Sequence, residues 1–289
     1  MNSPLISDAS LPAPIPLRGS NVQARTKALR RFRELATGRP VLSLGGLLAL
    51  LLLWEGGIAL LEQNVPMAKM FAPAQALPDL VRLLAENQLT MHTLVSLRRV
   101  AVGLFWALVF GVPIGLAIGA SSRLESATSG AFQFLRMISP LSWMPVAVML
   151  FGIGDAPIYF LLSFAAVWPI ILNTSAGVRQ LDRRWLMLAR SLSATRREIL
   201  WKIVIPGSLG HILTGLRLAI GIVWIILVPC EMLGVSSGLG YFILDTRDRM
   251  AYSELMAVIV LIGALGFLLD TGAQRLHRHW ARGRSSARH

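Results

Sequence analysis

Residues 156–178 read APIYFLLSFAAVWPIILNTSAGV, a run of 23 positions without a charged side chain. Residues 100–120, VAVGLFWALVFGVPIGLAIGA, form a second uncharged run of 21 positions. An α-helix rises about 1.5 Å per residue, so each run is long enough to cross a hydrocarbon core of about 30 Å. These two stretches predict a fold built on membrane-spanning helices.

Weaker candidate spans lie on both sides of these runs. Residues 41–61, 212–233 and 253–272 are long and mainly apolar, although each contains or borders a charged residue. Residues 126–154 contain Pro140 and Pro145, and proline breaks a continuous helix, so this stretch is predicted to be a bent span. The sequence therefore predicts an all-α membrane protein with about six transmembrane helices.

The composition agrees with membrane insertion. Of the 289 residues, 54% are hydrophobic and 15% are charged, against roughly 25% charged in an ordinary soluble domain. The 28 Lys and Arg outnumber the 15 Asp and Glu, giving a net charge of +13. These basic residues stand between apolar runs and not along one polar face, which favours the ends of membrane helices over a nucleic-acid surface.

The basic residues also predict the orientation, because Lys and Arg accumulate in short cytoplasmic segments. Six spans put both termini on one side, and that side carries 21 of the 28 basic residues. Both termini are therefore predicted to be cytoplasmic. The opposite side carries Lys69, Arg82, Arg98, Arg99, Arg247 and Arg249. Of these, Arg98 and Arg99 are interpreted as anchors at the outer interface.

The two ends of the chain are predicted to be cytoplasmic tails. Residues 1–40 are proline-rich and basic and read as a disordered tail, and residues 273–289 form a second basic tail. The first apolar run begins only at Val41, which is too late for a cleaved signal peptide. The first span is therefore expected to stay attached.

Motifs for catalysis are missing from the sequence. No G-x-x-x-x-G-K-[ST] loop and no G-x-S-x-G elbow occurs, and the five histidines lack partners at metal-ligand spacing. The chain is thus predicted to be no enzyme, to hydrolyse no ATP and to bind no metal. The single Cys230 lies in an apolar run and is interpreted as a packing residue.

The loop between the fourth and fifth spans, residues 179–211, reads RQLDRRWLMLARSLSATRREILWKIVIPGSLGH. Its apolar residues recur at helical spacing, which predicts two amphipathic helices. Thr195 is the predicted N-cap of the second helix, and Pro206 is predicted to end it. A hairpin this apolar either lies on the lipid headgroups or docks onto a partner.

Over residues 93–270 the chain resembles the membrane permease subunits of bacterial ATP-binding-cassette (ABC) importers, in the nitrate/sulfonate/bicarbonate (taurine) branch. The stretches that carry this resemblance are HTLVSLRRVAVG (92–103), PLSWMPVAVMLFGIG (140–154), ARSLSAT (189–195), TGLRLAIGIVW (214–224) and EMLGVSSGLGYFI (231–243). The resemblance implies a type I importer permease (MetI-like) core in the bacterial inner membrane.

The family's cytoplasmic loop has the pattern E-A-A, three residues, Gly, nine residues, Ile-x-Leu-Pro. Its spacing is kept here, but Met187-Leu188-Ala189 replaces E-A-A and Ser193 replaces Gly. Serine disfavours a left-handed turn. By resemblance, the residues that couple to the ATPase are Met187, Leu188, Ala189, Ser193, Ala194, Ile203 and Pro206. An arginine at Ala189 or Ala194 is expected to abolish transport while leaving the protein folded in the membrane, because its bulk and charge would obstruct docking of the loop.

The resemblance also implies the assembly. It comprises a second copy of this chain, a cytoplasmic ATPase dimer that binds ATP and Mg²⁺, a periplasmic or lipid-anchored solute-binding protein, and membrane lipid; no cofactor is expected on this chain. The solutes of the branch are aliphatic sulfonates such as taurine, nitrate and bicarbonate. The alternative function is a stand-alone channel or a secondary transporter.

Three residues are candidates for the translocation pathway or its gate: Arg136, Pro140 and Glu231. Arg136 either lies at a break in the third span, where it would attract an anion, or extends to the cytoplasmic headgroups. Glu231 either lines the pathway or is a carboxylate at a helix end in the interface. Residues 234–240 beside it form an outer gate or only a turn.

Overall fold

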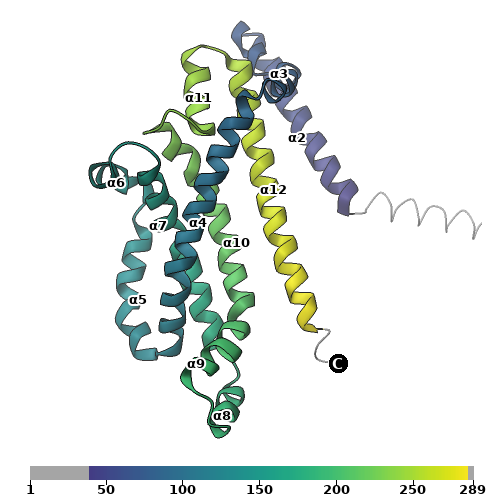
Figure 1. Cartoon of the computed structure of the whole chain (residues 1–289). Coiled ribbons are helices and arrows are strands. Elements are labelled where there is room, and N and C mark those ends of the chain that lie inside the picture. Colours follow the sequence, from purple (N-terminus) through teal and green to yellow (C-terminus); the bar gives the residue numbers. More distant parts are fainter. Residues whose placement is uncertain (1–38, 286–289) are drawn as a thin grey trace, which may run out of the picture. The chain divides into compact units, whose positions relative to one another are not determined.

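The structure, a computed structural model, describes residues 39–285, and every regular element within that range is a helix. Along the chain these are α2 (Arg39–Glu62), η1 (Pro66–Phe71), α3 (Pro73–Ala85), α4 (Gln88–Ala120), α5 (Ser122–Met137), η2 (Pro140–Trp143), α6 (Met144–Phe151), α7 (Asp155–Arg179), α8 (Arg183–Ser191), α9 (Arg196–Ile199), η3 (Leu200–Val204), α10 (Ile205–Met232), α11 (Leu239–Asp248) and α12 (Tyr252–Ser285). Figure 1 labels most of them.

The chain divides into two units, Met1–Asn64 and Val65–His289. In the first unit the structure describes α2, a helix of 24 residues that contains the predicted span at 41–61. The disordered tail expected at residues 1–40 lies outside the described residues except for its last two positions. All further structural statements concern the second unit.

Four helical segments of the described chain are long and apolar enough to cross a membrane: Gln88–Ala120, Asp155–Arg179, Arg196–Met232 and Tyr252–Leu276. They confirm the predicted spans at 100–120, 156–178, 212–233 and 253–272. The bent span is also present, because Ser122–Met137 and Pro140–Phe151 meet at 85°. The described residues thus give four or five crossings, and the count of six stays a prediction.

Helices α4 and α7 pack closely along their length because glycines line the contact face of α4. A Cβ atom added at Gly115 would lie 2.6 Å from the Cβ of Thr174, and one at Gly111 would lie 2.8 Å from Ile170 Cγ2. Small residues let membrane helices approach each other closely. Thr174 is therefore a packing residue between the two helices.

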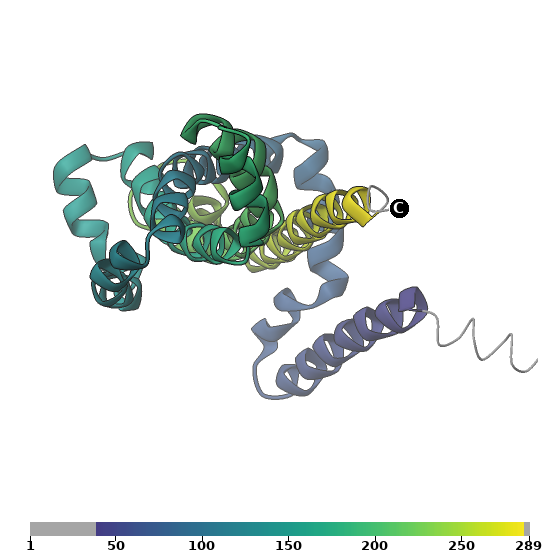
Figure 2. The same cartoon turned by 90° about the horizontal axis from the view of Figure 1, so that it is seen from below.

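Helix α10 packs on the same α7, and the three helices enclose a core that includes Leu162, Ile170, Val223 and Leu227. Viewed from below, α4, α7 and α10 form one cluster with α12 beside it (Figure 2). A second core joins α3, the start of α4, α11 and α12. In the Val65–His289 unit, α11 lies at one end and α8 and α9 at the other (Figure 1).

One boundary prediction needs correction. Pro206 does not end the second helix of the loop, since α9, η3 and α10 follow one another directly and form one helical segment from Arg196 to Met232. This continuity joins the loop to a membrane span. At the other end of the chain, α12 continues from Tyr252 into the predicted basic tail as far as Ser285.

Candidate functional site

The hairpin comprises α8, the turn at residues 192–195, α9 and η3. Asp182 caps α8 by accepting a hydrogen bond from the backbone N–H of Arg184 at 2.9 Å. At the second helix, the N–H of Glu198 donates to Thr195 Oγ1 at 3.3 Å, and the N–H of Thr195 donates to Glu198 Oε2 at 2.9 Å. This reciprocal pair is a capping box, so the predicted N-cap at Thr195 is confirmed.

The turn keeps its left-handed residue although serine replaces the family's glycine. Ser193 has φ of 58°, its N–H donates to the carbonyl of Arg190, and the N–H of Ala194 donates to the carbonyl of Ala189, both at 3.0 Å. This pair of bonds closes the C-terminus of α8 as a Schellman motif. A left-handed conformation costs a serine about 1–2 kcal/mol. The two hydrogen bonds offset this cost, so the turn forms although serine disfavours it.

Pro206 lies in the first turn of α10, directly after the π-helical segment η3. A proline ring crowds the carbonyl four residues earlier and lacks an N–H. A π-helix is wider than an α-helix, so η3 relieves this crowding and the helix continues. The second helix of the hairpin is therefore continuous with the span that ends at Met232.

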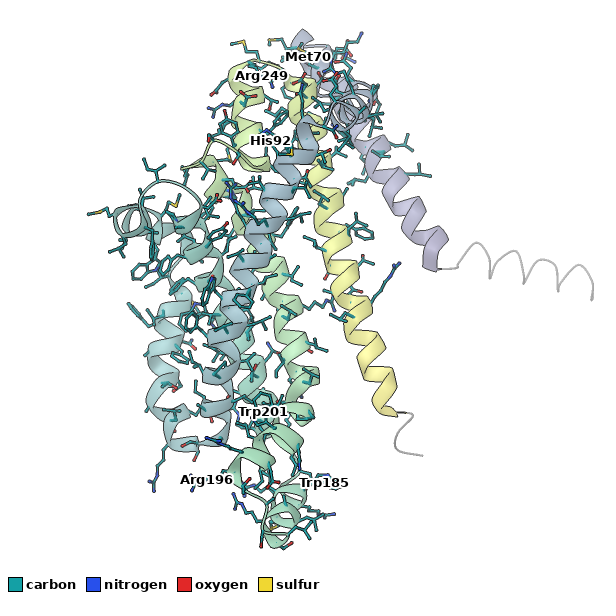
Figure 3. All side chains as sticks on the ribbon, in the orientation of Figure 1. Met70, His92, Trp185, Arg196, Trp201 and Arg249 are labelled. Carbon is teal, nitrogen blue, oxygen red and sulfur yellow. The ribbon has the colours of Figure 1, made fainter. Side chains whose placement is uncertain are left out.

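The hairpin exposes a set of large apolar side chains. The exposed fractions are 62% for Trp185, 61% for Met187, 51% for Leu188, 74% for Leu192 and 68% for Trp201. Figure 3 shows Trp185 and Trp201 together with Arg196 at this end of the molecule. We call these five side chains the apolar face of the hairpin.

The remaining residues assigned to coupling differ in exposure. Ser193 and Pro206 are exposed and Ala194 and Ile203 are half-buried, whereas Ala189 is only 7% exposed. Because Ala189 lies inside the hairpin, an arginine there would disturb its folding. A test of docking must therefore use Met187 or Leu188.

At the opposite end, a buried ion pair joins α4 to α10. The side chain of Arg99 is 1% exposed and that of Glu231 is 0% exposed, and Arg99 Nη1 donates to Glu231 Oε1 at 2.7 Å. Arg99 also donates from Nη2 to Asp155 Oδ1 at 2.6 Å. The interpretation of Arg99 as an interfacial anchor is wrong, because two carboxylates hold its guanidinium inside the protein. Arg98 stays exposed and pairs with Asp155 from outside.

Glu231 accepts further hydrogen bonds from Ser96 Oγ at 2.7 Å and from the backbone N–H of Gly240 at 2.9 Å. Gly238, with φ of +112°, lies so close that an added Cβ would be 2.5 Å from both Arg99 Nη1 and Glu231 Cδ. Ser96, Arg99, Asp155 and Glu231, which we call the Arg99 cluster, thus join α4, α7 and α10 to the segment that leads into α11.

The sequence interpretation singled out Glu231 but not its partners. Two adjacent arginines point in directions about 100° apart on a helix, so only one of Arg98 and Arg99 faces the core. An ionisable residue inside a span is by default functional and paired. Applying this rule to Arg99 would have identified the cluster from the sequence.

Arg136 and Pro140 lie on the two sides of the bend between α5 and α6. Arg136 is in the last turn of α5, and Pro140 begins η2. Since Arg136 is 14 residues from the first residue of α5, it lies roughly 20 Å along the helix from that end. Arg136 also lines a cavity of about 150 Å³ between α5 and α7. The structure does not bring Arg136 and Glu231 into one site.

Comparison with known proteins gives a consistent result. Residues 111–285 match the family described as binding-protein-dependent transport system inner membrane component. A bicarbonate transport system permease protein, CmpB, from Synechococcus elongatus is 34% identical, with 88% of this chain and 94% of that protein covered. The taurine transport system permease protein TauC of Escherichia coli is 32% identical over 82% of this chain and 87% of that protein.

Two further comparisons extend this picture. A nitrate import permease protein, NrtB, from Leptolyngbya laminosa is 36% identical over 61% of this chain and 63% of that protein. Among solved structures, a chain of the MetNI methionine ABC transporter in an inward-facing conformation superposes with a TM-score of 0.55 at 21% identity, covering 64% of this chain and 92% of that one. The structural match shows that the fold is shared.

Proposed function

The chain belongs to the binding-protein-dependent transport system inner membrane component family, and from this premise we propose that it forms the membrane pathway for a small oxyanion. It is a permease subunit of an ABC importer, not an enzyme, and ATP is hydrolysed on a separate subunit. Its partners are that ATPase and a solute-binding protein.

The proposed solute class follows from the relatives. Their names give bicarbonate, taurine and nitrate as solutes. All three present a compact group of oxygen atoms that share a negative charge. Arg136 supports the same class, because it is an exposed cation beside the bend that lines a cavity, and a positive charge attracts anions.

The observation that carries the coupling role is the continuity of the hairpin with α10. The apolar face of the hairpin stands at one end of the helical segment Arg196–Met232, and Glu231 stands at the other end. We propose that the ATPase binds the apolar face and that its movement is transmitted along this segment to the Arg99 cluster. The alternative to ATPase binding is that the apolar face rests on lipid headgroups.

The proposed orientation places the hairpin in the cytoplasm. Seven basic residues lie between positions 179 and 202, as the positive-inside rule requires of a cytoplasmic segment. At the other end, each of Arg82, Arg98, Arg99, Arg247 and Arg249 pairs with a carboxylate. Both termini would then be cytoplasmic, and two copies of the chain in the bacterial inner membrane would complete the permease.

Reconstitution tests this function directly. Proteoliposomes that contain the chain, its ATPase and the solute-binding protein are expected to accumulate labelled bicarbonate, taurine or nitrate only when ATP is supplied on the hairpin side. An ATPase variant unable to hydrolyse ATP serves as the control. Equal flux without ATP or without the ATPase would overturn the importer assignment in favour of a channel or a secondary transporter.

A further inference from the structure

Helix α5 contacts the rest of the described chain with one face only. None of its 16 residues is fully buried. The half-buried residues recur at helical spacing and mark the face that lies against the protein: Glu125, Thr128, Phe132 and Leu135. In both views α5 lies at the edge of the cluster formed by α4, α7 and α10 (Figures 1 and 2). Most of the surface of α5 therefore faces something other than this chain.

Contacts with α7 place α5 at the depth of a membrane span. Glu125, in the first turn of α5, forms an ion pair with Arg179, the last residue of α7. Further along α5, the ring of Phe132 lies 5.4 Å from the ring of Trp168, which is near the middle of α7. Helix α5 thus runs alongside α7 from the end of α7 to about its middle, next to the uncharged run at residues 156–178.

The exposed side chains of α5 fall on two sides of different character. Beyond the first turn, one side is apolar and includes Ala127, Ala131 and Phe134. The other side carries five exposed polar residues at steps of three or four positions, which places them in one line along the helix. We call this line the polar stripe, and it consists of Ser122, Ser126, Ser129, Gln133 and Arg136.

A hydrocarbon environment does not suit the polar stripe. The hydroxyls of Ser126 and Ser129 donate to backbone carbonyls of α5 itself, at 3.0 and 3.4 Å. Gln133 and Arg136 have no such partner, because no described residue hydrogen-bonds or pairs with either side chain. Ionisable residues at membrane depth face the interior of a bundle or a water-filled cavity. The polar stripe therefore requires a partner other than lipid.

A second copy of the chain can face the polar stripe across water but not pack against it stripe to stripe. Two copies inserted in the same orientation are related by a two-fold axis along the membrane normal, so equal residues lie at equal depth. Direct packing of the two stripes would bring Arg136 against the partner's Arg136, and like charges at close range repel each other. A gap that holds water and anions removes this conflict.

We propose that the polar stripe forms one wall of the water-filled passage through which the solute crosses the membrane, and that Arg136 gives this passage its preference for anions. The proposal rests on the proposed function as a permease and adds which surface of the chain meets the solute. The cavity of about 150 Å³ beside α5 supports it, because Ser129, Gln133 and Arg136 of the stripe line this cavity. The apolar side of α5 is then left for lipid.

Single cysteines test this wall directly. In a Cys230→Ala background, Ser126→Cys and Ser129→Cys place a thiol on the polar stripe, and Ala131→Cys places a matched thiol about 200° around the same helix from position 129. The assembled importer in open membrane fragments is treated with a small, water-soluble anionic thiosulfonate. A thiol in apolar surroundings forms little of the reactive thiolate, so the stripe positions are expected to react at least about tenfold faster than Ala131→Cys.

A further thiol tests the role of Arg136. In Gln133→Cys, one helical turn from Arg136, the anionic reagent is expected to react faster than a cationic reagent of similar size. Adding Arg136→Gln should slow the anionic reagent about fivefold, the effect of one unit charge at a few ångströms in water. Arg123→Gln, which removes an arginine from the other end of α5, is the control and should leave the rate unchanged. Equal effects of the two arginine changes would overturn the role of Arg136.

Other outcomes would overturn the wall itself. Equally slow reaction at Ser129→Cys and Ala131→Cys, with the Tm of the background chain kept, would show that the stripe is covered. Disulfide formation between two copies of Ser129→Cys in place of reaction with the reagent would identify a second copy as the cover. Full ATP-driven uptake after complete modification of Ser126→Cys and Ser129→Cys would place the passage elsewhere and keep the importer. Reactive stripe positions without ATP-driven uptake would keep the wall and overturn the importer assignment.

Discussion

Replacing Glu231 with alanine is expected to destabilise the chain so strongly that little folded protein remains in the membrane. Arg99 would stay buried with one of its two carboxylates gone, and Ser96 and the N–H of Gly240 would lose their acceptor. Breaking a buried ion pair by removing one partner costs about 3–5 kcal/mol. A domain has only about 5–15 kcal/mol of stability in total. The yield of monodisperse protein and its Tm after extraction measure the loss.

Graded variants separate charge from shape at the same position. Glu231→Gln keeps the side chain's size and its acceptor oxygen, so a smaller loss is expected. Asp245→Asn, which breaks the exposed pair between Asp245 and Arg249, should cost less than about 1 kcal/mol. Arg99→Met combined with Glu231→Leu is expected to recover part of the stability that either single change loses. An alanine variant at Glu231 as stable as Asp245→Asn would refute the structural role of the Arg99 cluster.

Placing a carboxylate on the apolar face of the hairpin is expected to weaken ATPase binding strongly. Leu188 is 51% exposed, so Leu188→Asp leaves the folded chain intact. At an interface the same change removes an apolar contact and buries an unpaired charge, a loss of at least about 2 kcal/mol. That corresponds to roughly a 30-fold weaker complex. Copurification of the ATPase and ATP-driven uptake are the measurements.

The control for this variant is Leu188→Met, which keeps an apolar side chain of similar volume and is expected to retain the ATPase. The Tm of the permease alone should be the same for both variants. If Leu188→Asp retained the ATPase and full uptake, the apolar face would not be the docking surface, and its contact with lipid headgroups would become the better explanation.

Local features of this fold were predictable from the sequence. The uncharged runs correctly predicted α4 and α7 as membrane-spanning helices, because hydropathy and length alone decide which helices cross a membrane. The break at Pro140 and the cap at Thr195 also depend only on nearby residues. The hairpin could be predicted because the helical periodicity of its apolar residues is a local feature. The spacing of the family's loop pattern, which is kept in this hairpin, indicated the family.

Features that depend on distant residues were missed. Whether Arg98 or Arg99 turns inward is decided by Asp155 and Glu231, which are far away in the sequence. Pro206 was expected to end a helix because proline usually does, and only the π-helical turn before it, which has no recognisable sequence signal here, allows α10 to continue. The cavity beside Arg136 likewise requires α5 and α7 to be packed together first.

The most direct test of the central claim, that a separate ATPase holds the hairpin on the cytoplasmic side, uses one introduced cysteine. The chain has a single native cysteine, Cys230, which is buried, so Leu188→Cys in a Cys230→Ala background places one reactive thiol on the apolar face. We predict that an impermeant maleimide labels this thiol in inside-out vesicles only, and that a short bifunctional maleimide cross-links it to the ATPase. Labelling in intact cells, or no cross-link in the assembled complex, would contradict the claim.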